Sequence, residues 1–339
     1  MLLLLFVSVM TATVVSQQPP GVYNETFAEK MLNMAAAAHA SDGGTIAKCL
    51  NKTFPGRQWL VWSNQSVQCD NKGNLCQGFV AVSYYDMKIL VSYRGTEGFD
   101  QMFEEVKSGL GDMVFYNGVQ GQGSVIRYFY DAVNSLYTPL DIATLIKWYP
   151  SFEIWITGHS LGGALATLTA LNLATIEGVN GAQIKLVTFG EPRVGDFHFA
   201  QTLRSFLPNM IRVVHGSDPI PHGPPCGHAN DFCSSTCPLI AGEPFHAPQE
   251  IWYSSLTKEM TLGDYRICTS NTDGGEDPTC SNSVGCLRRL RDGAAMHLNY
   301  FSHFIPDYGK AGCVDFAASH SLSAFLVTIV SVFAAFGSM

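Results

Sequence analysis

The chain has 339 residues, of which 47% are hydrophobic and only 14% are charged, and its formal net charge is −8. Soluble domains usually carry about 25% charged residues, so strongly apolar segments are expected in this chain. The acidic balance and the lack of a run of lysines and arginines exclude a protein that binds nucleic acid through a basic patch.

The first apolar segment is the amino terminus. Residues 1–16 are uncharged and apolar, and they end on small residues before Gln17. This pattern is typical of a secretory signal peptide, with a buried helix as the alternative. We therefore predict a signal peptide at 1–16, a folded domain at 17–313 and an extracellular location.

The predicted elements follow from hydrophobic periodicity. Residues 26–40 are rich in alanine and methionine and predict a helix. Residues 77–93 contain two alternating runs around a turn at 86–88, which predicts a hairpin. A helix is expected next at 124–137, followed by a strand at 152–157.

The second half continues the same alternation. A helix is expected at 161–176, with short apolar strands at 184–189 and 210–215. The stretch 219–286 is rich in cysteine, proline and glycine, so we expect loops tied by disulfides there, with one strand at 250–253. Strands that alternate with helices predict an α/β domain with a mostly parallel central sheet.

The chain ends in a second apolar segment, at 322–336. It is short for a transmembrane helix, and no basic residue follows it. Small residues precede it, as in a GPI signal, but the polar spacer is shorter than usual. For the tail at 314–339, attachment to the outer cell surface and a helix packed on the domain both stay open.

The cysteines and sequons agree with export. An even number of cysteines in an exported chain predicts up to five disulfides. Asn24, Asn51 and Asn64 begin Asn-x-Ser/Thr triplets and are candidate glycosylation sites. The ten cysteines all follow the predicted signal peptide: Cys49, Cys69, Cys76, Cys226, Cys233, Cys237, Cys268, Cys280, Cys286 and Cys313.

The sequence GHSLG at 158–162 fits the pattern G-x-S-x-G around Ser160. A predicted strand precedes it and a helix of small residues follows it. This is the context of a tight strand-to-helix turn that exposes a nucleophilic serine. The amino terminus of the helix favours the negative charge that develops during attack. A glycine-rich turn with an idle serine is the alternative.

A nucleophilic serine requires an orienting acid and a base, expected in the order Ser, Asp or Glu, His. Asp218 follows the strand at 210–215 and is the candidate acid, with an ordinary turn aspartate as the alternative. Chain order alone does not select the base among the histidines near and after this residue: His215, His222, His228, His246, His297, His303 and His320.

Five segments in order resemble the class 3 lipases, the fungal-type triacylglycerol lipase and feruloyl esterase family, over residues 26–313. They are VSYRGT at 91–96, GHSLGG at 158–163, FGEPRVG at 189–195, DPIP at 218–221 and MHLNYF at 296–301. The resemblance implies an α/β-hydrolase fold and a serine ester hydrolase that requires no metal or redox cofactor.

By this resemblance Ser160 is the nucleophile, Asp218 is the acid and His297 is the base. The resemblance also implies an oxyanion hole formed by Thr96 and the backbone N–H of Leu161. His297 would take the serine proton as the hydroxyl attacks an ester carbonyl, and Asp218 would fix the imidazole tautomer. An acyl-enzyme would then react with water.

The family carries its lid just after the Arg-Gly-Thr segment. Apolar side chains recur there at helical spacing, opposite acidic ones: Phe99, Met102, Phe103, Val106 and Leu110. They predict a lid that opens on lipid, with an ordinary surface helix as the alternative. We expect an acylglycerol substrate at a lipid–water interface; a soluble aryl ester, a phospholipid and a non-catalytic lipid-binding protein are the alternatives.

The clustered cysteines permit two interpretations. The candidate zinc ligands are Cys226, His228, Cys233 and Cys237. In an oxidising compartment disulfides are favoured, so we expect no metal site. By the family resemblance, Cys49 and Cys313 pair and close the domain.

Overall fold

The computed structural model describes most of the domain and neither end of the chain. The predicted signal peptide, the predicted lid residues, His228, His320 and the apolar tail lie outside the described residues. The described residues are 23–69, 73–96, 112–118, 121–226, 233–234, 236–247, 249–269 and 276–315.

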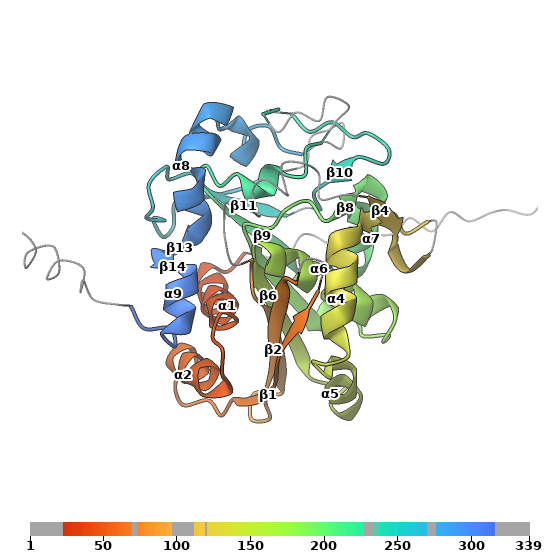
Figure 1. Ribbon diagram of the computed structural model, residues 1–339, viewed down its shortest axis with the longest axis vertical. Coiled ribbons are helices and arrows are strands. Elements are labelled where there is room, and N and C mark those ends of the chain that lie inside the picture. Colours follow the sequence, from red (N-terminus) through yellow and green to blue (C-terminus); the bar gives the residue numbers. More distant parts are fainter. Residues whose placement is uncertain are drawn as a thin grey trace, which may run out of the picture.

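An eight-stranded sheet forms the centre of the molecule (Figure 1). Its order is β1-β2-β3-β6-β7-β9-β11-β12, parallel from β3 to β11 and antiparallel at both ends. This confirms the predicted mostly parallel sheet. The strands are β1 (Leu60–Gln68), β2 (Leu75–Ser83), β3 (Lys88–Tyr93), β6 (Glu153–His159), β7 (Ile184–Phe189), β9 (Met210–His215), β11 (Glu250–Tyr253) and β12 (Tyr265–Ile267).

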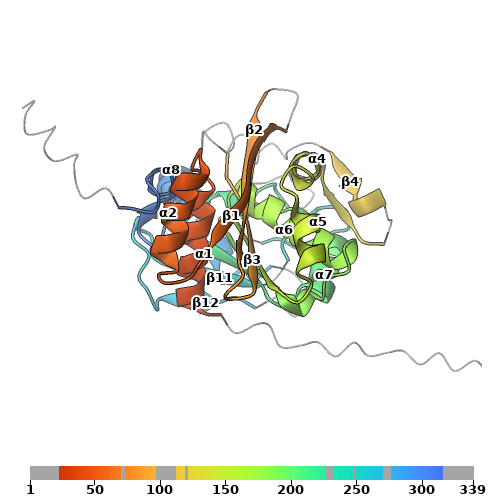
Figure 2. The same cartoon turned by 90° about the horizontal axis from the view of Figure 1, so that it is seen from below.

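Helices cover both faces of the sheet (Figure 2). On one face lie α1 (Glu25–Ala37) and α2 (Gly43–Thr53), with α9 (Ile305–Lys310) against α1. On the other lie α4 (Arg127–Tyr137) and α6 (Leu161–Thr175). Helix α6 is apolar around its whole circumference, because the sheet and α4 bury it on opposite sides. Each face has its own apolar core.

Most predicted elements appear where the sequence places them. The hairpin is β2–β3, and the strands expected at 184–189, 210–215 and 250–253 are β7, β9 and β11. The helices expected at 26–40 and 161–176 are α1 and α6. Further helices are α5 (Ile142–Trp148), α7 (Phe197–Phe206) and α8 (Cys286–Leu298).

Two predictions need correction. The helix expected at 124–137 begins only at Arg127, because β5 (Ser124–Ile126) pairs with β4 (Met113–Phe115) in a second sheet, of order β10-β8-β5-β4. In the region 219–286, where loops and one strand at 250–253 are expected, that strand is β11, and β12 adds an unpredicted strand at the edge of the main sheet by pairing with it. The other members of the second sheet are β8 (Gly195–Asp196) and β10 (Pro244–Phe245).

Five disulfides join all ten cysteines, as predicted. One links residues 264 positions apart and ties the start of the described domain to its end, which confirms the pairing implied by the family. Three others hold the 219–286 region. The pairs are Cys49–Cys313, Cys69–Cys76, Cys226–Cys237, Cys233–Cys286 and Cys268–Cys280.

Short elements complete the fold. The described residues contain four 3₁₀ turns, η1 (Tyr116–Gly118), η2 (Gly181–Gln183), η3 (Ile220–His222) and η4 (Ser281–Ser283). Strand β13 (Asn299–Tyr300) pairs with β14 (His303–Phe304). Within the described ranges, none of the helices has the length and apolar character needed to span a bilayer. The parallel strands β6, β7 and β9 end at one edge of the sheet, where the candidate site lies.

Candidate active site

Ser160 occupies the turn between β6 and α6. Its φ of 59° and ψ of −129° lie in a region that side-chain-bearing residues seldom adopt. Its backbone N–H donates to the carbonyl of Phe189, at the end of β7, with an N···O distance of 2.8 Å. The strained turn and this hydrogen bond hold Ser160 at the carboxyl edge of the sheet, as expected for a nucleophile elbow.

Glycines allow the backbone segments of this turn to approach one another. A Cβ on Gly158 would lie 2.0 Å from the carbonyl oxygen of Gly162. A Cβ on Gly162 would lie 2.3 Å from the carbonyl oxygen of Tyr93, at the end of β3. Neither approach is possible with a side chain, so the glycines of the motif are required for packing as well as for chemistry.

His297 and Asp218 form a buried pair at the same edge. The Nδ1 atom of His297, near the end of α8, lies 2.9 and 3.0 Å from the two carboxylate oxygens of Asp218, on the loop after β9. Residues 79 positions apart therefore meet in the order that a serine hydrolase requires.

The other described histidines have different partners. Nδ1 of His215 pairs with the carbonyl of Asn299, and Nε2 of His246 pairs with that of Pro221. His222 faces Asn282, and His303 faces Asp315. Among the described histidines, the ring of His297 is the one that pairs with Asp218, as the family resemblance implies.

The carboxylate of Asp218 accepts two further hydrogen bonds. The backbone N–H of Ile220 donates to Oδ1 at 2.9 Å, and the hydroxyl of Tyr300 donates to Oδ2 at 2.6 Å. Burial and the negative charge of Asp218 raise the pKa of Tyr300 well above its ordinary value, so Tyr300 keeps its proton. Tyr300 lies inside the MHLNYF segment, but the sequence provides no signal that assigns it this contact.

Gly190 places the end of β7 directly against the His297–Asp218 pair. Its φ is +57°, and a Cβ there would lie 2.6 Å from Oδ2 of Asp218 and 3.0 Å from Nδ1 of His297. Only a glycine allows the end of β7 to lie this close. The FGEPRVG segment therefore contacts the site through its glycine.

His159 links the serine turn to the histidine. Its Nε2 lies 2.7 Å from the carbonyl oxygen of His297, and the two rings are 4.4 Å apart at their centroids. Burial, followed by the charge of His297, lowers the pKa of His159 well below its ordinary value, so its ring is neutral and Nε2–H donates. The residue that precedes Ser160 therefore contacts His297 directly.

The predicted oxyanion residues flank the serine. A Cβ on Gly95 would lie 3.1 Å from the Cβ of Ser160, so the segment that ends in Thr96 passes directly beside the turn. Leu161 begins α6, where helix geometry leaves backbone N–H groups without an intrahelical acceptor. The predicted lid residues, Phe99, Met102, Phe103, Val106 and Leu110, lie outside the described residues.

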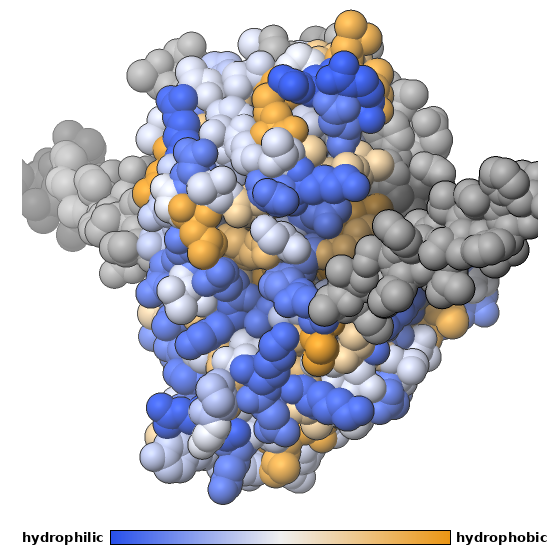
Figure 3. All heavy atoms as spheres, turned by 90° about the vertical axis from the view of Figure 1, so that its left-hand side faces the viewer, coloured by the Kyte–Doolittle hydropathy of each residue, from blue (hydrophilic) through white to orange (hydrophobic). Residues whose placement is uncertain are grey.

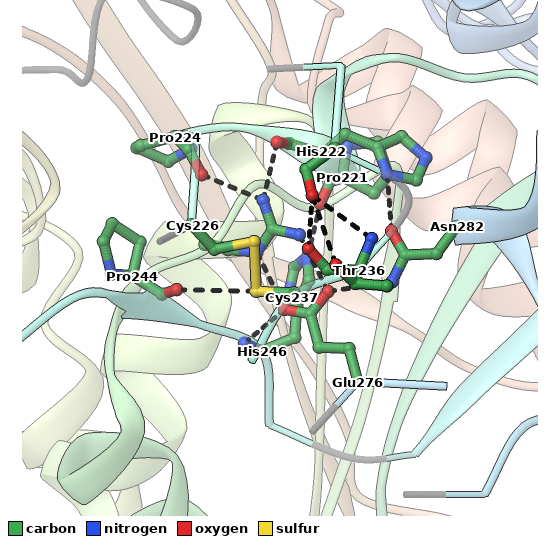
Figure 4. Close-up of a disulfide and its surroundings, with 12 residues drawn as sticks. Pro221, His222, Pro224, Cys226, Thr236, Cys237, Pro244, His246, Glu276 and Asn282 are labelled. Carbon is green, nitrogen blue, oxygen red and sulfur yellow. Dashed lines mark hydrogen bonds and ion pairs between the residues drawn. A yellow bond between two sulfur atoms is a disulfide. The ribbon is translucent and has the colours of Figure 1, made fainter. Parts of the chain in front are cut away.

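A buried ion pair stabilises the loop after β9 that contains Asp218, here called the acid loop (Figure 4). Nε and Nη2 of Arg193 each lie 2.7 Å from a carboxylate oxygen of Glu276. The same guanidinium donates to the carbonyls of His222 and Pro224, just beyond Asp218. Burial alone would raise the pKa of Glu276, but the charge and hydrogen bonds of Arg193 hold it well below its ordinary value.

The structure also distinguishes between a zinc site and disulfides in the cysteine cluster. Cys226 is bonded to Cys237, and Cys233 to Cys286, so none of them has a thiolate for zinc. Glu250, Cys268 and Cys280 also lie close together, but Cys268 and Cys280 are bonded to each other and therefore offer no thiolate to a metal ion either. The disulfide interpretation of these cysteines is confirmed.

Known proteins share the sequence and the fold. The family model described as Lipase (class 3) matches residues 90–228. Lipase ZK262.3 of Caenorhabditis elegans is 36% identical over 303 residues, which cover 86% of this chain and 83% of that protein. The lipase of Rhizomucor miehei is 32% identical over 221 residues, 63% of this chain and 52% of that lipase.

A solved structure has the same architecture. It is a triacylglycerol lipase whose catalytic centre is a serine protease triad, and its TM-score with this chain is 0.63 at 24% identity. The alignment covers 85% of this chain and 96% of that one. With a nematode lipase related over most of its length and the α/β-hydrolase architecture in place, the chain belongs to the class 3 lipase family and is a carboxylic ester hydrolase.

Proposed function

We propose that this lipase hydrolyses acylglycerols through an acyl-enzyme formed on Ser160, with His297 as general base and Asp218 as the orienting acid. The observation that carries the proposal is the buried contact between Nδ1 of His297 and both carboxylate oxygens of Asp218. It stands beside a serine in the strained turn of a nucleophile elbow.

The contact between His297 and Asp218 determines which nitrogen of the His297 ring can act as the general base. Because Nδ1 faces a carboxylate, it carries the ring proton, and Nε2 is then the nitrogen with a free electron pair. Nε2 takes the proton of Ser160 as Oγ attacks the carbonyl carbon, and the imidazolium is stabilised by Asp218. Return of that proton to the departing alcohol leaves the acyl group on Oγ, and water then releases the fatty acid by the same steps.

The oxyanion of each tetrahedral intermediate needs hydrogen-bond donors. We assign this role to Thr96 and to the backbone N–H of Leu161. Support comes from the close passage of Gly95 beside Ser160 and from the position of Leu161 at the start of α6. One such donor typically contributes about 3–4 kcal/mol to lowering the barrier.

The acylglycerol class is supported by the relatives, which include a triacylglycerol lipase of the same fold. The test is hydrolysis by the purified protein of emulsified triacylglycerol, a dissolved short-chain ester and a feruloyl ester, with Ser160→Ala alongside. We expect the emulsion to be preferred and the variant to be inactive. Activity confined to dissolved esters would overturn the acylglycerol assignment, and full activity of Ser160→Ala would overturn the mechanism.

We also infer that the protein acts outside the cell, with residues 1–16 as its signal peptide and 314–339 as a tail separate from the hydrolase domain. Five disulfides are the pattern of an oxidising compartment. Asn24 and Asn51 are exposed and accessible to glycosylation, whereas Asn64 is half-buried in β1. Mass spectrometry of the secreted protein tests the cleavage site, the tail and the glycans together.

A further inference from the structure

Helix α8, which carries His297, also carries an unusually exposed pair of leucines. Leu287 is 85% exposed, the highest fraction among the large apolar side chains that the structure describes, and Leu290 is 47% exposed. Single exposed leucines are common on protein surfaces and need no explanation. Two in one turn of a helix that enters the active site are a local apolar surface.

Helix geometry relates these leucines to the active site. Leu290 lies three residues after Leu287, so the two side chains are neighbours on the helix surface. His297 lies seven residues after Leu290, which places it on the same side of α8, two turns and roughly 10 Å further along the axis. His297 is buried whereas Leu287 is the most exposed of the three, so Leu290 lies at the border between the buried and the solvent-facing sides of α8.

The buried side of α8, which includes His297, is fixed to the protein. A Cβ on Gly293 would lie 2.6 Å from Cδ of Pro219, in the acid loop. The buried guanidinium of Arg289 donates to the carbonyl of Asn282 at 2.9 Å, and a disulfide holds the first residue, Cys286. The helix is thus rigidly seated, and its leucine side is held toward solvent.

Arginines accompany the leucines. Arg288 and Arg291 are exposed, and both approach the carboxylate of Asp292, at 3.6 and 2.7 Å. Two guanidinium groups against one carboxylate leave a local positive excess on a chain of net charge −8. Exposed ion pairs of this kind are weak, so the arginines can exchange Asp292 for phosphate. Figure 3 shows apolar and strongly hydrophilic side chains adjoining at the top of the face that carries α8.

We propose that this surface, defined by Leu287, Arg288, Leu290 and Arg291 and here named the α8 docking face, binds the enzyme to an anionic lipid surface. The leucines enter the boundary between headgroups and acyl chains, and the arginines contact lipid phosphates. The inference rests on the proposed function in one respect, because the helix that docks also carries His297, the proposed base, and the lipid surface holds the proposed substrate.

The test is vesicle binding by the full chain in a Ser160→Ala background, so that no lipid is consumed. Flotation compares phosphatidylcholine vesicles with vesicles that also contain phosphatidylglycerol. We expect the mixed vesicles to be preferred. Leu287→Ser with Leu290→Ser should weaken partitioning onto both kinds about 10-fold or more. Arg288→Gln with Arg291→Gln should remove the preference for the anionic vesicles.

A matched control exists at the opposite edge of the sheet. Leu60, 56% exposed, and nearby Arg57 offer the same residue types at the amino ends of the parallel strands. Leu60→Ser with Arg57→Gln should bind as the parent does, and thermal melts of every variant check folding.

Equal binding of the leucine variant and its parent would overturn the docking face, as would an equal loss in the control. Equal binding to both vesicle types would overturn the anionic partner. Hydrolysis of emulsified triacylglycerol and of a dissolved short-chain ester by the wild-type chain is measured separately. The absence of both activities would overturn the proposed function without altering the vesicle result.

Discussion

At the scale of single residues, the hydrogen bond from the hydroxyl of Tyr300 to Asp218 is a contact of the site that the sequence did not predict. It donates to Asp218 at 2.6 Å from a fully buried position, beside the bond that orients His297. A hydrogen bond to a charged group contributes about 1.5–3 kcal/mol. We therefore expect the orientation of Asp218 to depend on Tyr300.

Tyr300→Phe should lower kcat/KM roughly 10-fold on a dissolved ester, with the effect in kcat, because Asp218 then holds the imidazole less firmly. Tyr308→Phe is the matched control, since Tyr308 is also buried but stacks on His303 away from the acid. Steady-state kinetics on the two variants decide the point. Wild-type kcat in Tyr300→Phe would show that the hydroxyl has no positioning role.

Glu191, also buried, gives a prediction on pH. Burial raises its pKa from the ordinary 4.5 to about 7, against the lowering effects of Arg212 and of hydrogen bonds from Thr167 and Thr188. As pH rises from 4.5 to 7, the unfolded chain loses this proton before the folded chain does. The free energy of unfolding therefore falls across this window, by up to about 3 kcal/mol from this group.

Glu191→Gln removes the titrating group while keeping an amide oxygen for one threonine hydroxyl. Relative to wild type, the variant should gain stability between pH 5 and pH 8. Urea unfolding at the two pH values measures this gain. If the free energies of unfolding of wild type and variant change equally between the two pH values, the carboxyl does not titrate in the folded state as described.

The residues of the site differ in how far the sequence predicts them. Ser160 is marked by its local motif, since strand, glycines and helix are adjacent in the chain. His297 could be selected only by family resemblance, because several histidines satisfy the chain order. The contacts of Tyr300 and Gly190 with Asp218 depend on how distant strand ends and loops pack, which no local pattern encodes.

At the scale of elements, the acid loop depends on a brace from outside the sheet. Arg193, shortly after β7, pairs with Glu276, shortly before η4, and the guanidinium of Arg193 donates to the loop that follows Asp218. The pair also draws in the backbone N–H of His246 and the amide of Asn282, which donate to Glu276. The disulfide-rich region is thereby connected to the catalytic loop.

Glu276→Gln should lower the free energy of unfolding by about 3–5 kcal/mol, because it leaves the buried charge of Arg193 without its counter-charge. Denaturant unfolding measures the loss. Glu259→Gln, at an exposed position, should change stability by no more than about 0.5 kcal/mol. Equal stabilities of the two variants would mean that the ion pair does not brace the loop.

Element prediction succeeded where burial is continuous and failed where pairing with other strands, rather than the local pattern, defines the strand. β7 and β9 are short apolar runs inside a parallel sheet, and their bounds agree with the sequence pattern. β5 has the same local pattern as the helix that follows it, and its pairing with β4 and β8 makes it a strand. β12 is largely exposed and pairs at the sheet edge, so its side chains carry little periodic signal.

At the scale of the whole molecule, a disulfide links the two ends of the described domain. The Cys49–Cys313 disulfide joins α2 to the end of the described domain, and the ammonium of Lys52 donates to the carbonyl of Cys313. The alternation of strands and helices predicted the α/β architecture. The outermost strands β1 and β12 and most of the cysteine pairings were not predicted, because they depend on which surfaces meet after the core has formed.

The central claim is that Ser160, activated by His297, carries the acyl group. The most direct test is reaction of the purified chain with a nitrophenyl alkylphosphonate, followed by peptide mass spectrometry. We predict one phosphonyl adduct, on Ser160, with loss of ester hydrolysis in proportion to labelling, and little labelling of His297→Ala. Full ester hydrolysis by a chain labelled on Ser160, loss of hydrolysis with the adduct on another residue, or full hydrolysis by Ser160→Ala would contradict the account.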